Sequence, residues 1–544
     1  MKSSLKNKIN KKRIYLIRLL FPKRIALISK GLIKEGKTQL GIKLLKETVR
    51  IHPKHPDINK MLGSISVDRF EWKKALQYFE SIKVKSRDCE IIEGLSICYK
   101  VLGLSKKHRE LEARKYSNQL QSIYTDQVDI SDVINQSIKN KQWEIAIHAL
   151  EMMKKSNTKD NSHLIKLSMV YQIVGEHLKA RDTLQEFIEN ASEKSVDKNV
   201  GPQKMIIFDN GKTRIEFYKK TNHTNKIIMT FDSINMDWNE APFSFKVLEK
   251  ENVDIIAIRK YKKKTYQQDL SQFDFLYSVS SLVSRYNEKL SYGFSLGAYN
   301  ALYFSSLLNF RIYAISPRLS IHPIYGRTKV IGKHNFNHNL SFNHNNNIEP
   351  IIVYDPKNQL DYNFVNKEIL KAFPKTILIK TPYSGHGVAP FLLNIGQLKE
   401  FLLNVLDGKT PKYKRKNKEN SSAYLTNLAK ECIEHNKFNW ALSLSTTCLE
   451  LEPTNKEAVR IKGSALMNIE GEKEAYDFIK EKIKQNPKIL TFRNILIDLY
   501  IRSEQVELAK RTLKDTIEIF GDMPSLRSRK KMLECQDVKL NINN

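Results

Sequence analysis

Two long stretches of the chain, before residue 195 and after residue 420, place apolar residues at the three- and four-residue spacing of helices that bury one face. Within both stretches a small residue recurs every 34 positions. A small side chain at a fixed place lets two neighbouring helices approach closely. The pattern therefore predicts repeated pairs of packed helices. The spaced small residues are Gly41 and Ala75, Ala146 and Ala180, and Ala441, Ala475 and Ala509.

Prolines and one mismatch refine this pattern. Pro453 and Pro487 each stand twelve residues after one of these alanines, where a residue without a backbone N–H ends a second helix. Residues 89–126 fit poorly, because Arg109 occupies the position expected to be small. We expect about four or five pairs before residue 195 and about three after residue 420. The whole pattern resembles the tetratricopeptide repeat, a helix–turn–helix unit.

Between these stretches the hydrophobic pattern changes to short apolar runs that alternate with helical patterns. Two of the runs flank Asn210-Gly211, a favoured tight turn, and predict a β-hairpin. A hairpin followed by alternating strands and helices predicts a mainly parallel sheet with helices on both faces. The predicted strands are 205–208, 213–218, 227–231, 253–258, 290–294, 311–315, 350–354 and 376–379. The predicted helices are 273–286, 298–308, 363–373 and 390–406.

The predicted fold class is therefore multidomain, with α-helical repeats on either side of an α/β domain. At 544 residues the chain is too long for a single core. The segment 409–420 is basic, nearly free of apolar residues and holds Pro411, which suits a linker. The expected parts are a basic N-terminal segment over 1–24, helical repeats over 25–195, the α/β domain over 203–408, the linker over 409–420 and helical repeats over 421–535.

The net charge of +32 narrows the candidate partners. Residues 1–30 contain ten Lys or Arg and no acidic residue, which suits contact with an anionic surface such as lipid headgroups. Lysines spread over solvated helix faces explain the charge of the whole chain better. For the N-terminal segment both interpretations stay open. No nucleic-acid-binding motif accompanies the charge, so nucleic acid is not an expected partner.

Cysteine usage indicates a cytoplasmic protein. The five cysteines form no C-x-x-C pair, which is typical of reduced, buried thiols rather than disulfides or a zinc site. No apolar run reaches about 18 residues, so we expect no transmembrane helix. Interrupted apolar runs near the N-terminus argue against a signal peptide, and peripheral contact with a membrane stays open. The cysteines are Cys89, Cys98, Cys432, Cys448 and Cys535.

One motif carries candidate chemistry. The run Gly293-Phe294-Ser295-Leu296-Gly297 lies between a predicted strand and a predicted helix, the context of a nucleophile elbow that presents a serine hydroxyl. Ser295 is therefore the candidate nucleophile. With this motif, residues 203–408 resemble the α/β-hydrolase superfamily. The wider run 292–300, with Ile315-Ser316-Pro317, resembles hydrolase-like proteins of bacterial surface-polysaccharide loci.

The resemblance to α/β-hydrolases implies where the partners of Ser295 lie. In that family the serine is followed along the chain by an acidic residue and then by a histidine. His386 follows the last predicted strand and is the candidate base. Asp355 and Asp361 both follow the strand 350–354. We prefer Asp361 as the acid, because family acids usually lie a few residues beyond the strand, and Asp355 stays the alternative.

The oxyanion of acyl transfer needs two N–H donors. We expect the first at Leu296, the residue after the candidate nucleophile. The second is expected in the loop after the strand 227–231, at Asp232 or Ser233.

Two further clusters bear on ligands. The run 334–346 is rich in Asn and His, but no acidic or thiol residue is interleaved, so we expect a flexible insertion rather than a metal site. The cations Arg259, Lys260 and Lys262–Lys264 follow the strand 253–258 on the rim that carries the serine. An anionic substrate and a solvated loop are both compatible with this cluster, and we favour the loop.

These residues predict a serine hydrolase, either an esterase or an acyl-transfer enzyme, without a cofactor. The narrower resemblance implies an ester substrate such as an acylated glycan. Tetratricopeptide arrays have concave faces that suit peptides or proteins, so the repeats imply a protein partner or recruitment of the substrate. The alternative is a catalytically inactive hydrolase-fold adaptor whose function lies entirely in the repeats.

Overall fold

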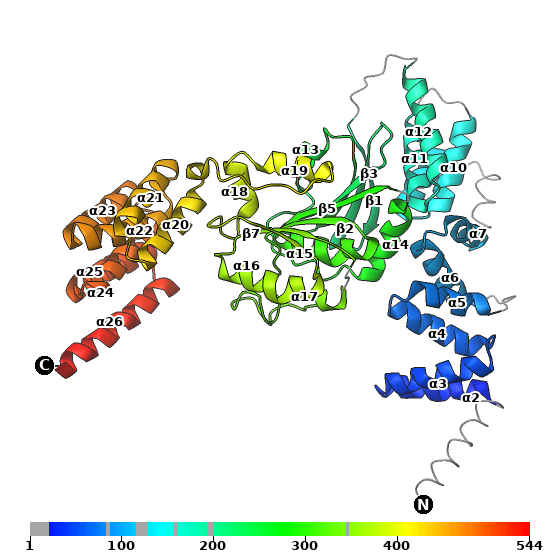
Figure 1. Ribbon diagram of the computed structural model, residues 1–544, viewed down its shortest axis with the longest axis horizontal. Coiled ribbons are helices and arrows are strands. Elements are labelled where there is room, and N and C mark those ends of the chain that lie inside the picture. The colour runs from blue at the N-terminus through cyan, green and yellow to red at the C-terminus, as the bar shows by residue number, and fades with distance from the viewer. Residues whose placement is uncertain are drawn as a thin grey trace, which may run out of the picture. The chain divides into compact units, whose positions relative to one another are not determined.

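The computed structural model describes residues 21–82, 88–115, 129–156, 161–192, 201–284, 286–343 and 347–543. These residues are mostly helical and include one mixed eight-stranded sheet (Figure 1). Most of the predicted basic segment, residues 1–20, lies outside the described residues. The chain divides into two compact units: Met1–Tyr292 with Asn300–Arg311 and Asn335–His338, and Gly293–Tyr299 with Ile312–His334 and Asn339–Asn544.

The first unit begins with helices that pack in consecutive pairs, blue to cyan in Figure 1. The second helix of each of four pairs carries a spaced small residue, and all four of these residues are buried. A Cβ on Gly41 would lie 2.9 Å from Ile33 Cγ1, so a larger residue would push that pair apart. The helices are α2 (Pro22–Lys34), α3 (Thr38–Ile51), α4 (Pro56–Asp68), α5 (Trp72–Ser81), α6 (Cys89–Val101), α7 (Ser105–Lys115), α9 (Ile130–Lys139), α10 (Trp143–Lys155), α11 (Ser162–Val174) and α12 (His177–Ser192).

The poor match to the repeat at Arg109 has a physical cause. In α7, Arg109 Nε lies 2.8 Å from Glu144 Oε1, and its Nη1 lies 3.6 Å from Glu176 Oε1. Glu144 is buried, and a buried carboxylate needs its cation, because removing one partner leaves an uncompensated charge. A polar contact between neighbouring helix pairs thus replaces the small residue here.

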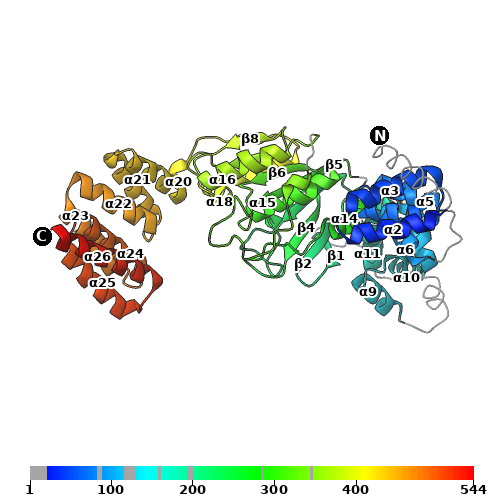
Figure 2. The same ribbon diagram turned by 90° about the horizontal axis from the view of Figure 1, so that it is seen from below.

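The second unit ends with a further set of paired helices, which Figure 2 shows from below. The alanines 441, 475 and 509 are fully buried in the second helices. Pro453 and Pro487 each follow the end of a second helix, as predicted. Among the described residues after 420, three pairs are followed by one further helix. The elements are η5 (Lys418–Asn420), α20 (Ser422–Glu434), α21 (Phe438–Leu451), α22 (Lys456–Ile469), α23 (Glu472–Gln485), α24 (Leu490–Arg502), α25 (Val506–Phe520) and α26 (Pro524–Asn543).

The sheet has the strand order β1-β2-β4-β3-β5-β6-β7-β8. β1 and β2 form the predicted hairpin, in which Asn210 Oδ1 accepts the N–H of Thr213 at 2.7 Å. β2 and β4 are antiparallel, whereas β3 with β4, β6 with β7 and β7 with β8 are parallel. All eight strands were predicted to within about two residues. They are β1 (Gln203–Asp209), β2 (Thr213–Lys219), β3 (Lys226–Phe231), β4 (Asp254–Lys260), β5 (Glu288–Phe294), β6 (Arg311–Ile315), β7 (Ile351–Tyr354) and β8 (Ile377–Lys380).

Three of the four predicted helices of this region are interrupted. The prediction of a single helix over 390–406 is wrong, because Gly396 adopts a left-handed φ of +74° that ends one helix before the next begins. The stretches 298–308 and 363–373 each contain a π-helical turn. The elements are α13 (Phe245–Leu248), α14 (Gln272–Val283), α15 (Leu296–Asn300), η1 (Ala301–Ser305), η2 (Ser306–Leu308), η3 (Leu340–Asn343), α16 (Gln359–Phe364), η4 (Val365–Ile369), α17 (Leu370–Ala372), α18 (Val388–Asn394) and α19 (Leu398–Leu406).

The basic cluster at the end of β4 is only in part the solvated loop that we favoured, because Lys262–Lys264 are exposed after the strand whereas Arg259 and Lys260 are not. Arg259 and Lys260 belong to the strand and are buried. Arg259 Nε donates to Asp232 Oδ1 at 2.9 Å, and Lys260 Nζ donates to Ile234 O at 2.9 Å. Burial lowers the pKa of Lys260 to about 8. These two cations therefore hold the loop after β3 in place.

The His- and Asn-rich run contains a buried histidine, so the expectation of a flexible insertion is wrong at His338. Its Nε2 lies 2.9 Å from Leu270 O, and its Nδ1 lies 3.1 Å from Gln268 Nε2. The ring stacks on Tyr303 with 4.6 Å between centroids. Within the described residues, which exclude His344, no group of three His, Cys, Asp or Glu side chains could hold a metal ion.

The cysteines and helices add two observations. Cys98, Cys432 and Cys448 are free and buried, whereas Cys535 is exposed, contrary to the expectation of buried thiols throughout. In the part of the chain that the structure describes, every helix is too short or too polar to cross a membrane.

Acid should destabilise the fold through His338. Burial lowers the pKa of His338 from 6.5 to about 4, so between these pH values the unfolded chain binds more protons and stability falls as pH falls. The stabilisation is complete above pH 6.5 and declines toward pH 4, by at most about 3 kcal/mol. Melting curves across this range should show a steeper loss for the wild type than for His338→Gln. Parallel pH profiles for the two proteins would contradict this assignment.

Candidate functional site

Ser295 occupies the turn between β5 and α15 with a φ of +55°, an uncommon conformation for a residue with a side chain. Its N–H donates to Ile315 O at 2.9 Å. Its carbonyl accepts the N–H of Tyr299 at 3.1 Å and that of Arg318 at 3.3 Å. The strained turn is thus held by the end of β6 and by the loop that follows it.

The turn requires glycine at position 293, because the backbone that follows Ser295 leaves no room for a side chain there. A Cβ at this position would lie 2.5 Å from the carbonyl carbon and oxygen of Gly297, and 2.7 Å from the backbone nitrogen of Ala298. These are backbone atoms, so no side-chain rotation can relieve the collision. The spacing of glycine and serine in the motif therefore reflects a close approach between the end of β5 and the start of α15.

Ser295, His386 and Asp361 form a continuous line of hydrogen bonds. Ser295 Oγ lies 2.8 Å from His386 Nε2, and His386 Nδ1 lies 2.9 Å from Asp361 Oδ2. Asp361 is fully buried, whereas 21% of the His386 side chain is exposed. Because a carboxylate can only accept, Nδ1 carries the proton in the neutral ring and Nε2 is left to accept the serine O–H.

Arg318 also contacts Asp361, and the sequence analysis missed it. Its Nη1 donates to Asp361 Oδ1 at 3.1 Å, and both side chains are buried. Burial lowers the pKa of Arg318, but a guanidinium stays charged at any ordinary pH. The cation offsets the desolvation of the carboxylate and fixes its orientation. The position of Arg318 in the sequence gives no sign that it contacts Asp361. It lies two residues after Ser316, which has a positive φ.

Asp361 is positioned by the start of α16. Its N–H donates to Asn358 Oδ1 at 3.2 Å, so Asn358 caps the helix. The cap therefore fixes the backbone of the first turn of α16, from which the Asp361 side chain extends. Aspartate in the first turn of a helix is also favoured by the helix dipole.

Asp355, the alternative acid, bonds backbone N–H groups instead of the imidazole. Its Oδ1 accepts the N–H groups of Lys357 at 2.8 Å and Tyr383 at 3.1 Å, and its Oδ2 accepts the N–H of Gly385 at 2.7 Å. Burial raises the pKa of Asp355. Tyr383 and Gly385 both have positive φ values, +68° and +67°. Asp355 therefore fixes a tightly turned loop that ends at His386.

The first helix of the C-terminal repeats contacts the same loop. Asn427 Nδ2, on α20, donates to Tyr383 O at 3.1 Å. A Cβ on Gly385 would lie 2.9 Å from Asn427 Nδ2. One helical turn further along α20, Glu431 Oε1 lies 2.5 Å from Lys357 Nζ. The histidine loop is thus held on one side by Asp355 and on the other by α20.

The three predicted oxyanion donors differ in their surroundings. Leu296 begins α15, where a backbone N–H has no acceptor within the helix. The N–H of Asp232 already donates to Ile258 O at 3.2 Å, and its carboxylate accepts from Arg259. Burial raises the pKa of Asp232 to about 6. The structure therefore speaks against Asp232, and Ser233 stays the candidate for the second donor.

The chain matches no protein-family model and no curated protein. Among solved structures, yeast Tom70 is similar over 96% of this chain and 96% of its own, at 11% identity and a TM-score of 0.22. An esterase of Pyrococcus furiosus is similar over 39% of this chain and 92% of its own, at 14% identity and a TM-score of 0.29. A "predicted CIB-like hydrolase" of Thermoplasma acidophilum is similar over 38% and 97%, at 16% identity and a TM-score of 0.26. TM-scores this low establish no shared fold.

Substitution of Gly293 by alanine should destabilise the turn. The added Cβ collides with fixed backbone atoms at 2.5 Å, and overpacking of this kind costs about 1–3 kcal/mol or more. The matched control is Gly201→Ala, where a Cβ meets nothing within 4 Å and the φ is not positive. Thermal melting should show a clear loss for Gly293→Ala and little change for Gly201→Ala. Equal melting curves would contradict the close approach at the turn.

Proposed function

We propose that this protein is a serine hydrolase of the α/β-hydrolase type, an esterase or acyl-transfer enzyme with Ser295 as nucleophile. The observation that carries the proposal is the unbroken line of hydrogen bonds from Ser295 Oγ through His386 to Asp361, at 2.8 Å and 2.9 Å. A line of this kind lets an imidazole take the hydroxyl proton while a carboxylate stabilises the resulting imidazolium. The positive φ at Ser295 adds support, because a strained strand-to-helix turn is typical of a nucleophile elbow.

The proposed reaction proceeds in two stages. Ser295 Oγ attacks the ester carbonyl carbon while His386 Nε2 takes its proton, and the N–H of Leu296 donates to the developing oxyanion. His386 then gives the proton to the alcohol oxygen, the carbon–oxygen bond of the ester breaks, and an acyl-enzyme remains. Water, or another acceptor with a hydroxyl group, repeats the same steps and releases the acyl group from Ser295.

Asp361 and Arg318 have different roles in this proposal. Asp361 holds the Nδ1–H tautomer of His386 and stabilises the ring when it becomes charged. Arg318, which contacts Asp361 and not the imidazole, acts through that carboxylate as a positioning residue. Its positive charge compensates the buried carboxylate of Asp361 and holds it in place while His386 gains and loses a proton.

The substrate class and the role of the repeats are part of the proposal. The three side chains suit acyl transfer in general, and an ester, more narrowly an acylated glycan, is proposed from the resemblance noted in the sequence. The paired helices present repeated surfaces for a protein partner or for recruitment of the substrate. The competing function is an inactive adaptor, in which these surfaces act alone.

Hydrolysis of p-nitrophenyl acetate by the full chain tests the proposal. Ser295→Ala and His386→Ala should each lower kcat by at least about 10³-fold, and Asp361→Asn by a similar factor, because the three groups act as one unit. Thermal melts of the same variants check that they are folded. A wild-type rate no higher than that of Ser295→Ala would contradict the enzyme and support the adaptor.

Loss of the Asn427 contact should weaken catalysis from a repeat helix. Asn427→Leu removes the hydrogen bond to Tyr383 O, so the histidine loop loses one of its supports and kcat should fall several-fold with little change in KM. The control is Asn468→Leu on α22, whose amide donates to Ser464 O within its own helix. An unchanged kcat for Asn427→Leu would show that α20 does not position the loop.

A further inference from the structure

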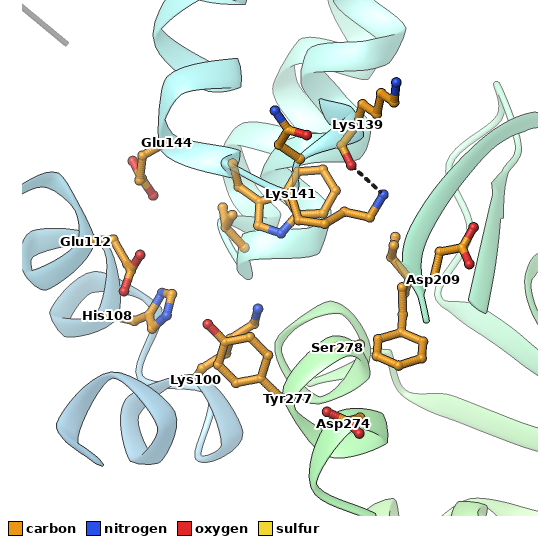
Figure 3. Close-up of a pocket in the computed structure, with 15 residues that line it drawn as sticks. Lys100, His108, Glu112, Lys139, Lys141, Glu144, Asp209, Asp274, Tyr277 and Ser278 are labelled. Carbon is orange, nitrogen blue, oxygen red and sulfur yellow. Dashed lines mark hydrogen bonds between the residues drawn. The ribbon is translucent and has the colours of Figure 1, made fainter. Parts of the chain in front are cut away.

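A cavity of about 480 Å³ lies within the first unit, among the helix pairs, the end of β1 and α14 (Figure 3). Lys100 of α6 lies on one side of it, and Lys141 lies on the other, in the turn between α9 and α10. The aromatic side chains of Trp143, Phe208 and Tyr277 also line this cavity. The cavity shares no lining residue with the Ser295 site.

Lys100 is a buried cation. Its exposed fraction is 6%, and its Nζ lies 3.7 Å from the centroid of the Tyr277 ring. Within the part of the chain that the structure describes, no carboxylate lies within ion-pair distance of this amine. Burial lowers the pKa of Lys100 to about 8, against the attraction of the more distant Glu112. A buried ammonium without a counter-charge is costly, so this position suits an anion that arrives from outside.

Lys141 provides a second cation for the same space. Its Nζ donates to the carbonyl oxygen of Lys139 at 3.2 Å, an uncharged partner (Figure 3). Burial lowers the pKa of Lys141 as well. Its backbone has a φ of +61°, a conformation held by the turn between two helices. Two lysines from separate elements thus line one cavity. Within the described residues, neither forms an ion pair with an acidic side chain.

The acidic residues of the cavity are already engaged. Glu144 and Asp209 are paired with arginines, whereas Glu112 and Asp274 accept serine hydroxyls. Glu112 attracts Lys100, and Asp209 attracts Lys141, from beyond ion-pair distance. The pairs are Glu112 with Ser96 at 2.9 Å, Glu144 with Arg109 at 2.8 Å, Asp209 with Arg214 at 2.8 Å and Asp274 with Ser271 at 2.6 Å.

We infer that this cavity binds a small aromatic anion, with its phosphate or carboxylate group between Lys100 and Lys141 and its ring against Trp143. Two ammonium groups supply charge-assisted hydrogen bonds to such an oxyanion. The indole of Trp143 supplies apolar area and stacking for the ring. The volume suits a ligand of small-metabolite size. The site is separate from the ester chemistry and makes the first unit a receptor for a metabolite.

Calorimetric titration of the full chain tests the inference, with phenyl phosphate, benzoate and inorganic phosphate as probes at constant ionic strength. Phenyl phosphate or benzoate should bind, and the stronger of the two identifies the anionic group. Inorganic phosphate, which lacks the ring, should bind more weakly. Lys100→Met should weaken binding at least about tenfold. The matched control is Lys155→Met, because Lys155 is an exposed lysine of α10 that does not line the cavity.

Several outcomes would overturn the inference. No binding of either aromatic anion to the wild type would do so, and so would equal affinity in Lys100→Met. Lys141→Met provides a second variant, which should also weaken binding if Lys100→Met does not fold. Binding should survive Ser295→Ala, because Ser295 does not line the cavity. A negative binding result therefore does not bear on the proposed hydrolase activity. A negative activity result likewise does not bear on this binding site.

Discussion

The close approach of the backbone at residues 293 and 297 is the constraint on which the candidate site depends. A distance of 2.5 Å between a Cβ on Gly293 and the carbonyl of Gly297 admits no other residue. The chain must then turn within one residue, and Ser295 takes a left-handed conformation in which its hydroxyl meets His386. A relaxed turn would remove both the strain and this hydrogen bond.

Two buried carboxylates near this turn, Asp361 and Asp355, have different partners. Asp361 meets the imidazole and Arg318, whereas Asp355 accepts backbone N–H groups of the surrounding loops. Asp355 therefore fixes the conformation of the loop that carries His386. Asn427 bonds that loop from a repeat helix. The geometry of three side chains thus rests on contacts drawn from the end of β7, the loop after β6 and the C-terminal repeats.

Much of this organisation was readable in the sequence, because it depends on local rules. The 34-residue spacing, the turn at Asn210-Gly211 and the strand–turn–helix context of Ser295 each follow from steric requirements within a few residues. The choice of Asp361 over Asp355 came instead from the resemblance to α/β-hydrolases, whose acids usually lie a few residues beyond the strand. Arg318, Asn427 and the buried role of Arg259 were not predictable, because each depends on a partner 27 to 44 positions away. Spacing alone does not reveal such pairs.

The most direct test of the account is covalent labelling. The full chain is incubated with a fluorophosphonate, and its intact mass and proteolytic peptides are measured. One adduct is expected, on Ser295, and it should be lost in Ser295→Ala and strongly slowed in His386→Ala, because the hydroxyl needs the imidazole to take its proton. An unlabelled wild type, or labelling that is unchanged in His386→Ala, would contradict the claim that this turn presents an activated serine.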